Sequence, residues 1–165
     1  TRILPNGNFG PIYESESFTE DIWIAGLPRL HIDVSTATVG GQIYALLEDC
    51  SEDGSCIHIG HAIMDLRYHE GGNQEQTWLP IFDTINAKME FFAMDVQIKA
   101  GHIIRLSLAS TGEDYLPAST SSIIEVSEGS SSNLLFDIIN PENKLLFNPP
   151  ACIHQSCLDW LNQSN

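Results

Sequence analysis

Residues 21–67 read DIWIAGLPRLHIDVSTATVGGQIYALLEDCSEDGSCIHIGHAIMDLR, and this stretch decides the fold. Apolar runs rich in β-branched residues are separated by turn signals at Gly26-Leu27-Pro28, at Gly40-Gly41 and at Asp53-Gly54. Such runs bounded by Gly, Pro and Asp are typical of β-strands joined by tight turns. The rest of the chain repeats this pattern as far as residue 139.

Alternation of apolar and polar side chains marks the strands. In residues 29–35, Leu30, Ile32 and Val34 share one face of the predicted strand, as the period of two requires. Other strands are predicted at 22–25, 42–49, 57–67, 87–98, 102–110, 122–127 and 133–139. About eight short strands with regular turns and no sequence repeat predict an all-β, two-sheet antiparallel β-sandwich of the jelly-roll type, with very little helix.

The chain divides into three parts. Residues 1–18 are predicted to be an extended leader or linker from a preceding domain, residues 19–139 the sandwich, and residues 140–165 an irregular tail pinned to it. The 165 residues suffice for one domain with a core of its own. A chain that starts at Thr1 without a signal-peptide pattern is interpreted as a mature product or, as we favour, a fragment.

The formal net charge is −15, from 22 acidic and 7 basic residues. Binding to nucleic acid or to anionic lipid needs clustered Lys and Arg, so neither partner is expected. No apolar run approaches the roughly 20 residues that span a bilayer. The charge indicates high solubility or adaptation to a salty environment.

Cysteines occur as two close pairs, Cys50 with Cys56 and Cys152 with Cys157. An even number in local pairs favours two short-loop disulfides, and with them an oxidising location: secreted or on the cell surface. Four reduced thiols, or another of the three possible pairings, remain the alternatives.

A nucleophilic active site finds no support in the sequence. There is no Gly-x-Ser-x-Gly motif, and the β/α alternation that presents such a serine is missing. We therefore expect no catalytic residues in this chain.

Metal ligands are suggested at two places. Asp49, Ser51 and Asp53 precede Gly54 as in the opening of a calcium loop, but Gly60 stands where a bidentate carboxylate belongs. The alternative is an ordinary Asp-Gly hairpin turn. Cys152-x-His154-x-x-Cys157 offers three zinc ligands but lacks a fourth, and a disulfide would use both sulfurs. No cofactor is expected, with calcium as the alternative.

His58 and His61 lie three residues apart on a predicted strand. A period of two places them on opposite faces, so they are not expected to bind one metal ion together. Gly60, between them, is predicted to mark a bulge or a close approach of the backbone.

Sugar binding is suggested by aromatic residues in or beside loops. Tyr68, Trp78 and Tyr115 offer ring faces on which a sugar could stack. Such residues equally often pack against a loop or a neighbouring domain. The polar stretch 68–78 is long enough to serve a function of its own.

Several short motifs resemble one family. They are the entry segment 13–36 (with Phe18 where Pro-Leu is usual), a run carried by Leu47, Asp49, Asp53, Gly54, Gly60, Leu66 and Arg67, the strand Lys99-Ala100-Gly101-His102-x-x-Arg105-Leu106, and Pro117. In this order they are similar to the C-terminal non-catalytic domain of X-prolyl dipeptidyl-peptidases, cocaine esterase and α-amino acid ester hydrolases.

This resemblance implies a galactose-binding-like jelly roll that packs on an upstream α/β-hydrolase domain of the same polypeptide. The Ser-Asp-His triad lies in that domain, and no triad residue falls here. The implied function is a non-catalytic accessory domain of a secreted serine peptidase or esterase, which supports the catalytic domain and walls its substrate cleft. The alternative is a stand-alone, lectin-like carbohydrate-binding module. The cysteine pairs and the tail after residue 140 depart from the family pattern.

Residues at a domain interface or a ligand site are expected among the arginines and the polar loop. Arg67 and Arg105 are hypothesised to be held by carboxylates, as partly buried guanidinium groups must be, and the alternative is that both are exposed. The candidates are Arg67, Tyr68, His69, Trp78, Arg105 and Tyr115.

Overall fold

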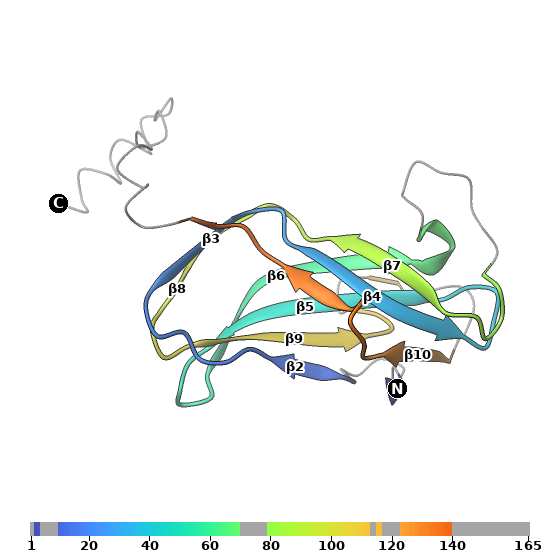
Figure 1. Cartoon of the computed structure of the whole chain (residues 1–165), viewed down its shortest axis with the longest axis horizontal. Coiled ribbons are helices and arrows are strands. Elements are labelled where there is room, and N and C mark those ends of the chain that lie inside the picture. Colours follow the sequence, from blue (N-terminus) through green and yellow to red (C-terminus); the bar gives the residue numbers. More distant parts are fainter. Residues whose placement is uncertain (1, 4–9, 70–78, 113–114, 117–122, 140–165) are drawn as a thin grey trace, which may run out of the picture.

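Two layers of antiparallel strands build the molecule (Figure 1). The computed structural model describes residues 2–3, 10–69, 79–112, 115–116 and 123–139. The strands in chain order are β1 (Arg2–Ile3), β2 (Ile12–Glu14), β3 (Ile22–Gly26), β4 (Arg29–Thr36), β5 (Gln42–Cys50), β6 (Cys56–Asp65), β7 (Ile85–Glu90), β8 (Met94–Ile98), β9 (Ile103–Ala109), β10 (Ile124–Ser127), β11 (Asn133–Leu135) and β12 (Ile138–Ile139).

The first layer is centred on β4. Strand β7 pairs along one edge of β4, while β10 and β11 follow each other along the opposite edge and β1 pairs with β10. A three-stranded sheet, β12-β3-β8, continues this layer beyond Pro28, where the chain passes from β3 to β4. Pro28 carries no backbone N–H for the ladder, which explains the break at this point.

The second layer has the strand order β2-β9-β5-β6. Strand β5 lies inside this sheet, as its apolar sequence predicts, with Leu47 opposite Leu106 of β9 and opposite Gly60 of β6. The register shifts between Leu47 and Glu48, because Glu48 faces His58 and leaves Ile59 as an extra residue. The bulge predicted at Gly60 is present one residue earlier, at Ile59. A Cβ on Gly60 would approach the end of the Met94 side chain to 2.5 Å, so the layers also come close here.

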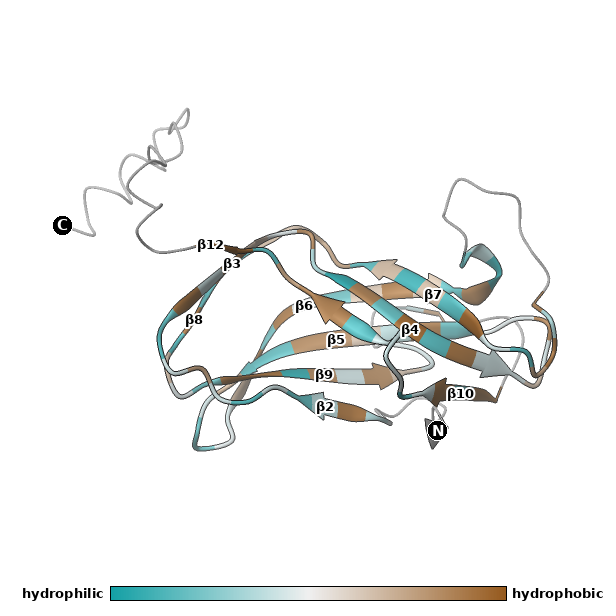
Figure 2. Cartoon of the chain, viewed as in Figure 1, coloured by the Kyte–Doolittle hydropathy of each residue, from teal (hydrophilic) through white to brown (hydrophobic). Residues whose placement is uncertain are grey.

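The core lies between the layers and follows the predicted alternation. Leu30, Ile32 and Val34 are buried, and brown and teal alternate along β4 in Figure 2. The opposite wall comes from β5 and β9, with Leu47 and Leu108 fully buried. The prediction of an all-β antiparallel sandwich with very little helix is confirmed, because the described residues contain one short 3-10 turn as their helical element.

Two predicted strands are each interrupted. Residues 87–98, predicted as one strand, form the end of β7 and β8, because Phe91 turns inward, is 1% exposed and donates its N–H to the Pro28 carbonyl. Residues 133–139 likewise divide into β11 and β12. The mixed periodicity of 87–98 reflects this break, which a single-strand interpretation missed.

The sandwich was predicted to comprise residues 19–139, but residues before it also contribute strands. Within the expected leader, β1 pairs with β10 and β2 pairs with β9. The expected tail, 140–165, lies outside the described residues. In the described part of the chain, no helix has the length and apolar character needed to cross a membrane.

Candidate functional site

The 3-10 turn η1 (Leu66–Tyr68) follows β6 at one end of the sandwich (Figure 1). The Asp65 side chain caps this turn: its Oδ1 accepts hydrogen bonds from the backbone N and from Nε of Arg67, both at 3.0 Å. The side chains of Arg67 and Asp65 are 24% and 28% exposed. Hydrogen bonding from Arg67 lowers the pKa of the Asp65 carboxyl. The hypothesis that a carboxylate holds Arg67 is confirmed.

Apolar side chains on neighbouring segments are exposed at the same end. Tyr68 of η1 and Val39 are each more than one third exposed, while Ile81 is 47% and Phe82 75% exposed. Backbone hydrogen bonds tie their segments together, with the N–H of Leu66 donating to Gly41 at 2.8 Å and that of Leu79 to Val39 at 3.5 Å. We call Val39, Tyr68, Ile81 and Phe82 the end surface.

Phe82 has an unusual backbone conformation. Its φ is 66°, in the left-handed region that bulky residues rarely adopt. The turn is nevertheless fixed, because the Phe82 N–H donates to the Thr36 carbonyl at 2.8 Å and that of Asp83 to the Pro80 carbonyl at 3.4 Å. The described chain therefore holds an aromatic side chain in solvent at a conformational cost. Strain of this kind and exposed apolar groups are typical of binding surfaces.

Arg105 lies on the outer face of the four-stranded sheet. Its Nε donates to Oε1 of Glu14 at 2.9 Å, and the two residues are register partners on β9 and β2. The Arg105 side chain is 29% exposed, so it too is held by a carboxylate, as hypothesised. The pair joins the edge strand β2 to β9, and an ion pair this accessible to water contributes little net stability.

His58 and His61 lie on the same face of β6, which makes the prediction of opposite faces wrong. Nδ1 of His61 is 3.3 Å from Nε2 of His58, and Nε2 of His61 is 2.9 Å from the Tyr115 hydroxyl. The bulge at Ile59 is the physical reason. With one extra residue in the strand, side chains three positions apart point to the same face. His58 is the exposed member of the pair, and His61 is partly buried.

Aromatic rings enclose His61. The Tyr44 ring stacks on it with centroids 5.7 Å apart, and the Phe92 ring meets it edge-on at 5.4 Å. Gly112 fits the Tyr44 ring so closely that a Cβ there would approach ring atoms to 2.5 Å. Packing of this kind fixes the orientation of the imidazole. We call His58, His61, Tyr115 and their ring neighbours Tyr44 and Phe92 the histidine cluster.

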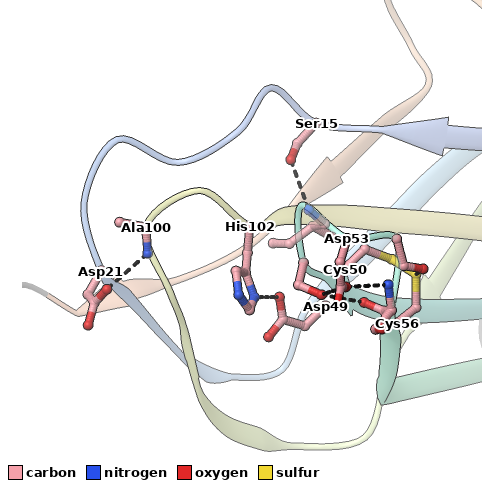
Figure 3. Close-up of polar contacts among 12 residues, drawn as sticks. Ser15, Asp21, Asp49, Cys50, Asp53, Cys56, Ala100 and His102 are labelled. Carbon is pink, nitrogen blue, oxygen red and sulfur yellow. Dashed lines mark hydrogen bonds and ion pairs between the residues drawn. A yellow bond between two sulfur atoms is a disulfide. The ribbon is translucent and has the colours of Figure 1, made fainter.

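The calcium candidates lie at the turn between β5 and β6 (Figure 3). Asp53 bonds within this turn, since its Oδ1 accepts hydrogen bonds from Ser51 Oγ at 2.6 Å and from Ser55 N at 2.9 Å. The Ser51 hydrogen bond contributes most to lowering the Asp53 pKa to about 2. With φ of 86° at Gly54, the arrangement matches the alternative, an Asp-Gly hairpin turn.

Asp49 has a separate partner in the same view. Its Oδ1 is 2.7 Å from Nδ1 of His102, at the start of β9 (Figure 3). Within the described ranges, no group of three or more His, Cys, Asp or Glu side chains is arranged to hold a metal ion. The same turn carries the disulfide Cys50–Cys56, which confirms the first predicted pair.

A cleft of about 550 Å³ opens between the two layers. Its lining includes aliphatic side chains from facing sheets, such as Leu30 and Leu106, and the aromatic side chains of Phe18 and Phe136. Polar groups such as Asn133 also line it. The cleft therefore combines an apolar surface with a few polar groups, the composition of many ligand sites, and the carbohydrate hypothesis stays a prediction.

The remaining predicted interface and ligand residues do not all lie in the polar loop 68–78. His69 Nδ1 lies 2.9 Å from the Leu66 carbonyl, which makes it part of the η1 turn. Trp78 lies outside the described residues, as do Cys152 and Cys157. Phe82 was missed altogether, because no sequence signal distinguishes an exposed Phe from a core Phe. His61 was missed because the two-residue alternation of a regular strand was assumed for residues 58–61. Gly60 had already indicated a bulge there, which interrupts that alternation.

The family model for the X-Pro dipeptidyl-peptidase C-terminal non-catalytic domain matches residues 8–141. The chain belongs to this family. The resemblance found from the short motifs is thereby confirmed. A search of curated proteins found no match.

Solved structures of hydrolases share the fold of this non-catalytic domain. An aminopeptidase from the marine sediment archaeon Thaumarchaeota archaeon has a TM-score of 0.68 and 15% identity over 78% of this chain and 25% of its own. A CocE/NonD family hydrolase from Staphylococcus aureus has a TM-score of 0.70 and 10% identity, and the match covers 83% of this chain and 32% of the hydrolase. An α-amino acid ester hydrolase has a TM-score of 0.64 and 17% identity, and the match covers 78% of this chain and 25% of the hydrolase. The domain thus spans between a quarter and a third of these chains.

Proposed function

We propose that this chain is the non-catalytic accessory domain of a larger peptidase or esterase, and that its end surface packs against the catalytic domain. The family match supports the accessory role. So does the small share of each hydrolase that the chain spans. The observation that carries the docking proposal is Phe82, which is 75% exposed in a strained backbone conformation.

Burial of the end surface against another domain would offset the conformational cost of the positive φ at Phe82. Complete burial of one Phe side chain is worth roughly 1.5–3 kcal/mol, enough to offset the cost of a left-handed residue. Tyr68 and Ile81 add apolar area beside it, and the Asp65–Arg67 pair fixes the position of η1. In this proposal the domain also walls the substrate cleft, as the family resemblance implies.

The partner in this proposal is an upstream α/β-hydrolase domain that carries a serine-type triad, as the family resemblance implies. A secreted or cell-surface location is supported by the Cys50–Cys56 disulfide, since such bonds persist in oxidising compartments. The alternative role as a carbohydrate-binding module has less support, because the Tyr115 ring packs on His61 and its hydroxyl lies 2.9 Å from Nε2 of His61.

The test uses the full-length protein that contains this chain. Phe82→Ala should raise KM and divide a single calorimetric unfolding transition into two, because the domains no longer stabilise each other. Phe92→Ala is the matched control, since Phe92 is 66% exposed but belongs to the histidine cluster. Equal behaviour of the two variants would contradict docking through the end surface.

A second variant separates docking from folding. Phe82→Gly should stabilise the 165-residue chain by about 1 kcal/mol, because glycine adopts positive φ without strain. The same change should still divide the transition in the full-length protein. If Phe82→Gly destabilises the chain itself, Phe82 contributes to internal packing, and the docking proposal fails.

A further inference from the structure

The histidine cluster places two imidazole nitrogens opposite each other at the surface of β6. Nδ1 of His61 and Nε2 of His58 are 3.3 Å apart. A first-row metal ion binds imidazole nitrogens at about 2.0–2.1 Å, so two such ligands on a tetrahedral ion lie about 3.3–3.4 Å apart. The observed spacing is that of a hydrogen bond between the two imidazoles, and it also matches one edge of a metal coordination tetrahedron.

The second nitrogen of His61 has the partner that a metal ligand requires. Metal-binding histidines usually donate the other ring N–H to an oxygen, which selects the tautomer and orients the ring. Nε2 of His61 lies 2.9 Å from the Tyr115 hydroxyl. When Nε2–H donates to Tyr115, Nδ1 carries the lone pair and faces His58. Thr111 holds the Tyr115 segment, because its Oγ1 donates to the Tyr115 carbonyl at 3.1 Å.

Packing prevents the His61 ring from turning away. Tyr44 stacks on one side, with an interplanar angle of 27°, and Phe92 closes the edge at 74°. Tyr44 is 7% exposed and serves as a fixed support. His58 is exposed, so coordination positions beyond the two nitrogens are open to solvent. Preorganisation of one ligand reduces the entropy lost when a metal ion binds.

We propose that His58 and His61 form a two-histidine binding site for a first-row transition-metal ion such as Zn²⁺, Cu²⁺ or Ni²⁺. Two nitrogen ligands suit these ions and not Ca²⁺, which takes oxygen ligands. Within the described residues, no third His, Cys, Asp or Glu is arranged with the pair, and the exposed side of His58 leaves coordination positions open to solvent donors. The net charge of −15 favours the approach of any cation.

Isothermal titration of the full chain with Cu²⁺ and Zn²⁺ at pH 7.5 tests the site. His58→Ala and His61→Ala should each lower the apparent affinity at least tenfold. Tyr115→Phe should lower it about tenfold, the loss expected when the oxygen partner of a ligating histidine is removed. His31→Ala on β4 and His154→Ala in the C-terminal segment are matched controls and should leave the affinity unchanged.

Electron paramagnetic resonance of the Cu²⁺-loaded chain counts the nitrogen ligands directly, and the unfolding temperature checks folding separately. The wild type should show hyperfine coupling to two imidazole nitrogens, and His58→Ala should show one. Because His58 is exposed, this variant should keep the unfolding temperature of the metal-free wild type. The proposal is overturned if the wild type binds no copper, or if its spectrum and affinity are the same after both histidines are replaced.

Discussion

The Tyr44 ring is confined by its neighbours on the outer face of the four-stranded sheet. A Cβ added at Gly112 would lie 2.5–2.7 Å from three atoms of this ring, which is only 7% exposed. We predict that Gly112→Ala destabilises the chain by about 1–3 kcal/mol, as overpacking usually does. Urea unfolding measures this change.

The matched control is Gly129→Ala. The nearest atom to a Cβ at this exposed position is Ser131 Oγ at 4.0 Å, so the unfolding midpoint should stay close to that of the wild type. Gly112→Ala should also shift the segment that carries Tyr115, whose N–H donates to the Gly112 carbonyl at 3.1 Å. Equal midpoints for both alanine variants would contradict the close fit against Tyr44.

Single residues were predictable where local chemistry decides. Cys50 and Cys56 flank one turn and are bonded, and Arg67 and Arg105 have carboxylate partners, as the cost of an unpaired guanidinium predicts. The histidine pair was not predictable by period two, because the bulge changes the phase of β6. Pairing of strands decides where a bulge falls, and pairing is a property of the whole sheet.

The β5–β6 hairpin is closed at its turn by the Cys50–Cys56 disulfide, whose cysteines are separated by 6 positions. Crosslinking a loop this short lowers the conformational entropy of the unfolded chain, which raises the free energy of unfolding by about 2 kcal/mol. We predict that Cys50→Ala/Cys56→Ala lowers the free energy of unfolding by about that amount. Ile57→Ala is the control, because its side chain is 68% exposed and should change stability by less than about 0.5 kcal/mol. A double variant as stable as the wild type would contradict this account.

Whole elements were predicted best where one face is buried. Strand β4 alternates as its sequence indicates, with Leu30, Ile32 and Val34 inward. The break between β7 and β8 was missed, because Phe91 turns inward to meet a core that only the folded layers create. Strand β1 contains two residues, too few for any periodic signal, and it exists through its pairing with β10.

The whole molecule carries a net charge of −15, because its 22 acidic residues outnumber its 7 Lys and Arg residues. Mutual repulsion of these groups destabilises the compact state, and salt screens it: the Debye length falls from about 10 Å at 0.1 M to about 3 Å at 1 M. We predict that the unfolding temperature rises between 0.1 M and 1 M NaCl. The exposed Lys99–Asp21 ion pair weakens under the same conditions but opposes this trend only slightly.

Thermal scans in NaCl and in KCl give the measurement, and the two salts should act alike if screening is the cause. A fall in the unfolding temperature with salt would mean that favourable ion pairs outweigh the repulsion. At this scale the motifs were sufficient to identify the family. They could not locate the end surface or the cleft, because both depend on how layers far apart in sequence come together.

The pairing of the first strands with late ones also determines when the domain can fold. Arg2 pairs with Val126, Tyr13 with Leu106 and Ile22 with Ile98, so each early strand waits for a partner more than 70 residues away. Sheets with such non-local pairing fold in milliseconds to seconds, whereas a ribosome adds only about 5–20 residues per second. During synthesis the central strands therefore emerge with unpaired edges for several seconds. Yield in a foreign host should depend on what shields those edges more than on the stability of the finished sandwich.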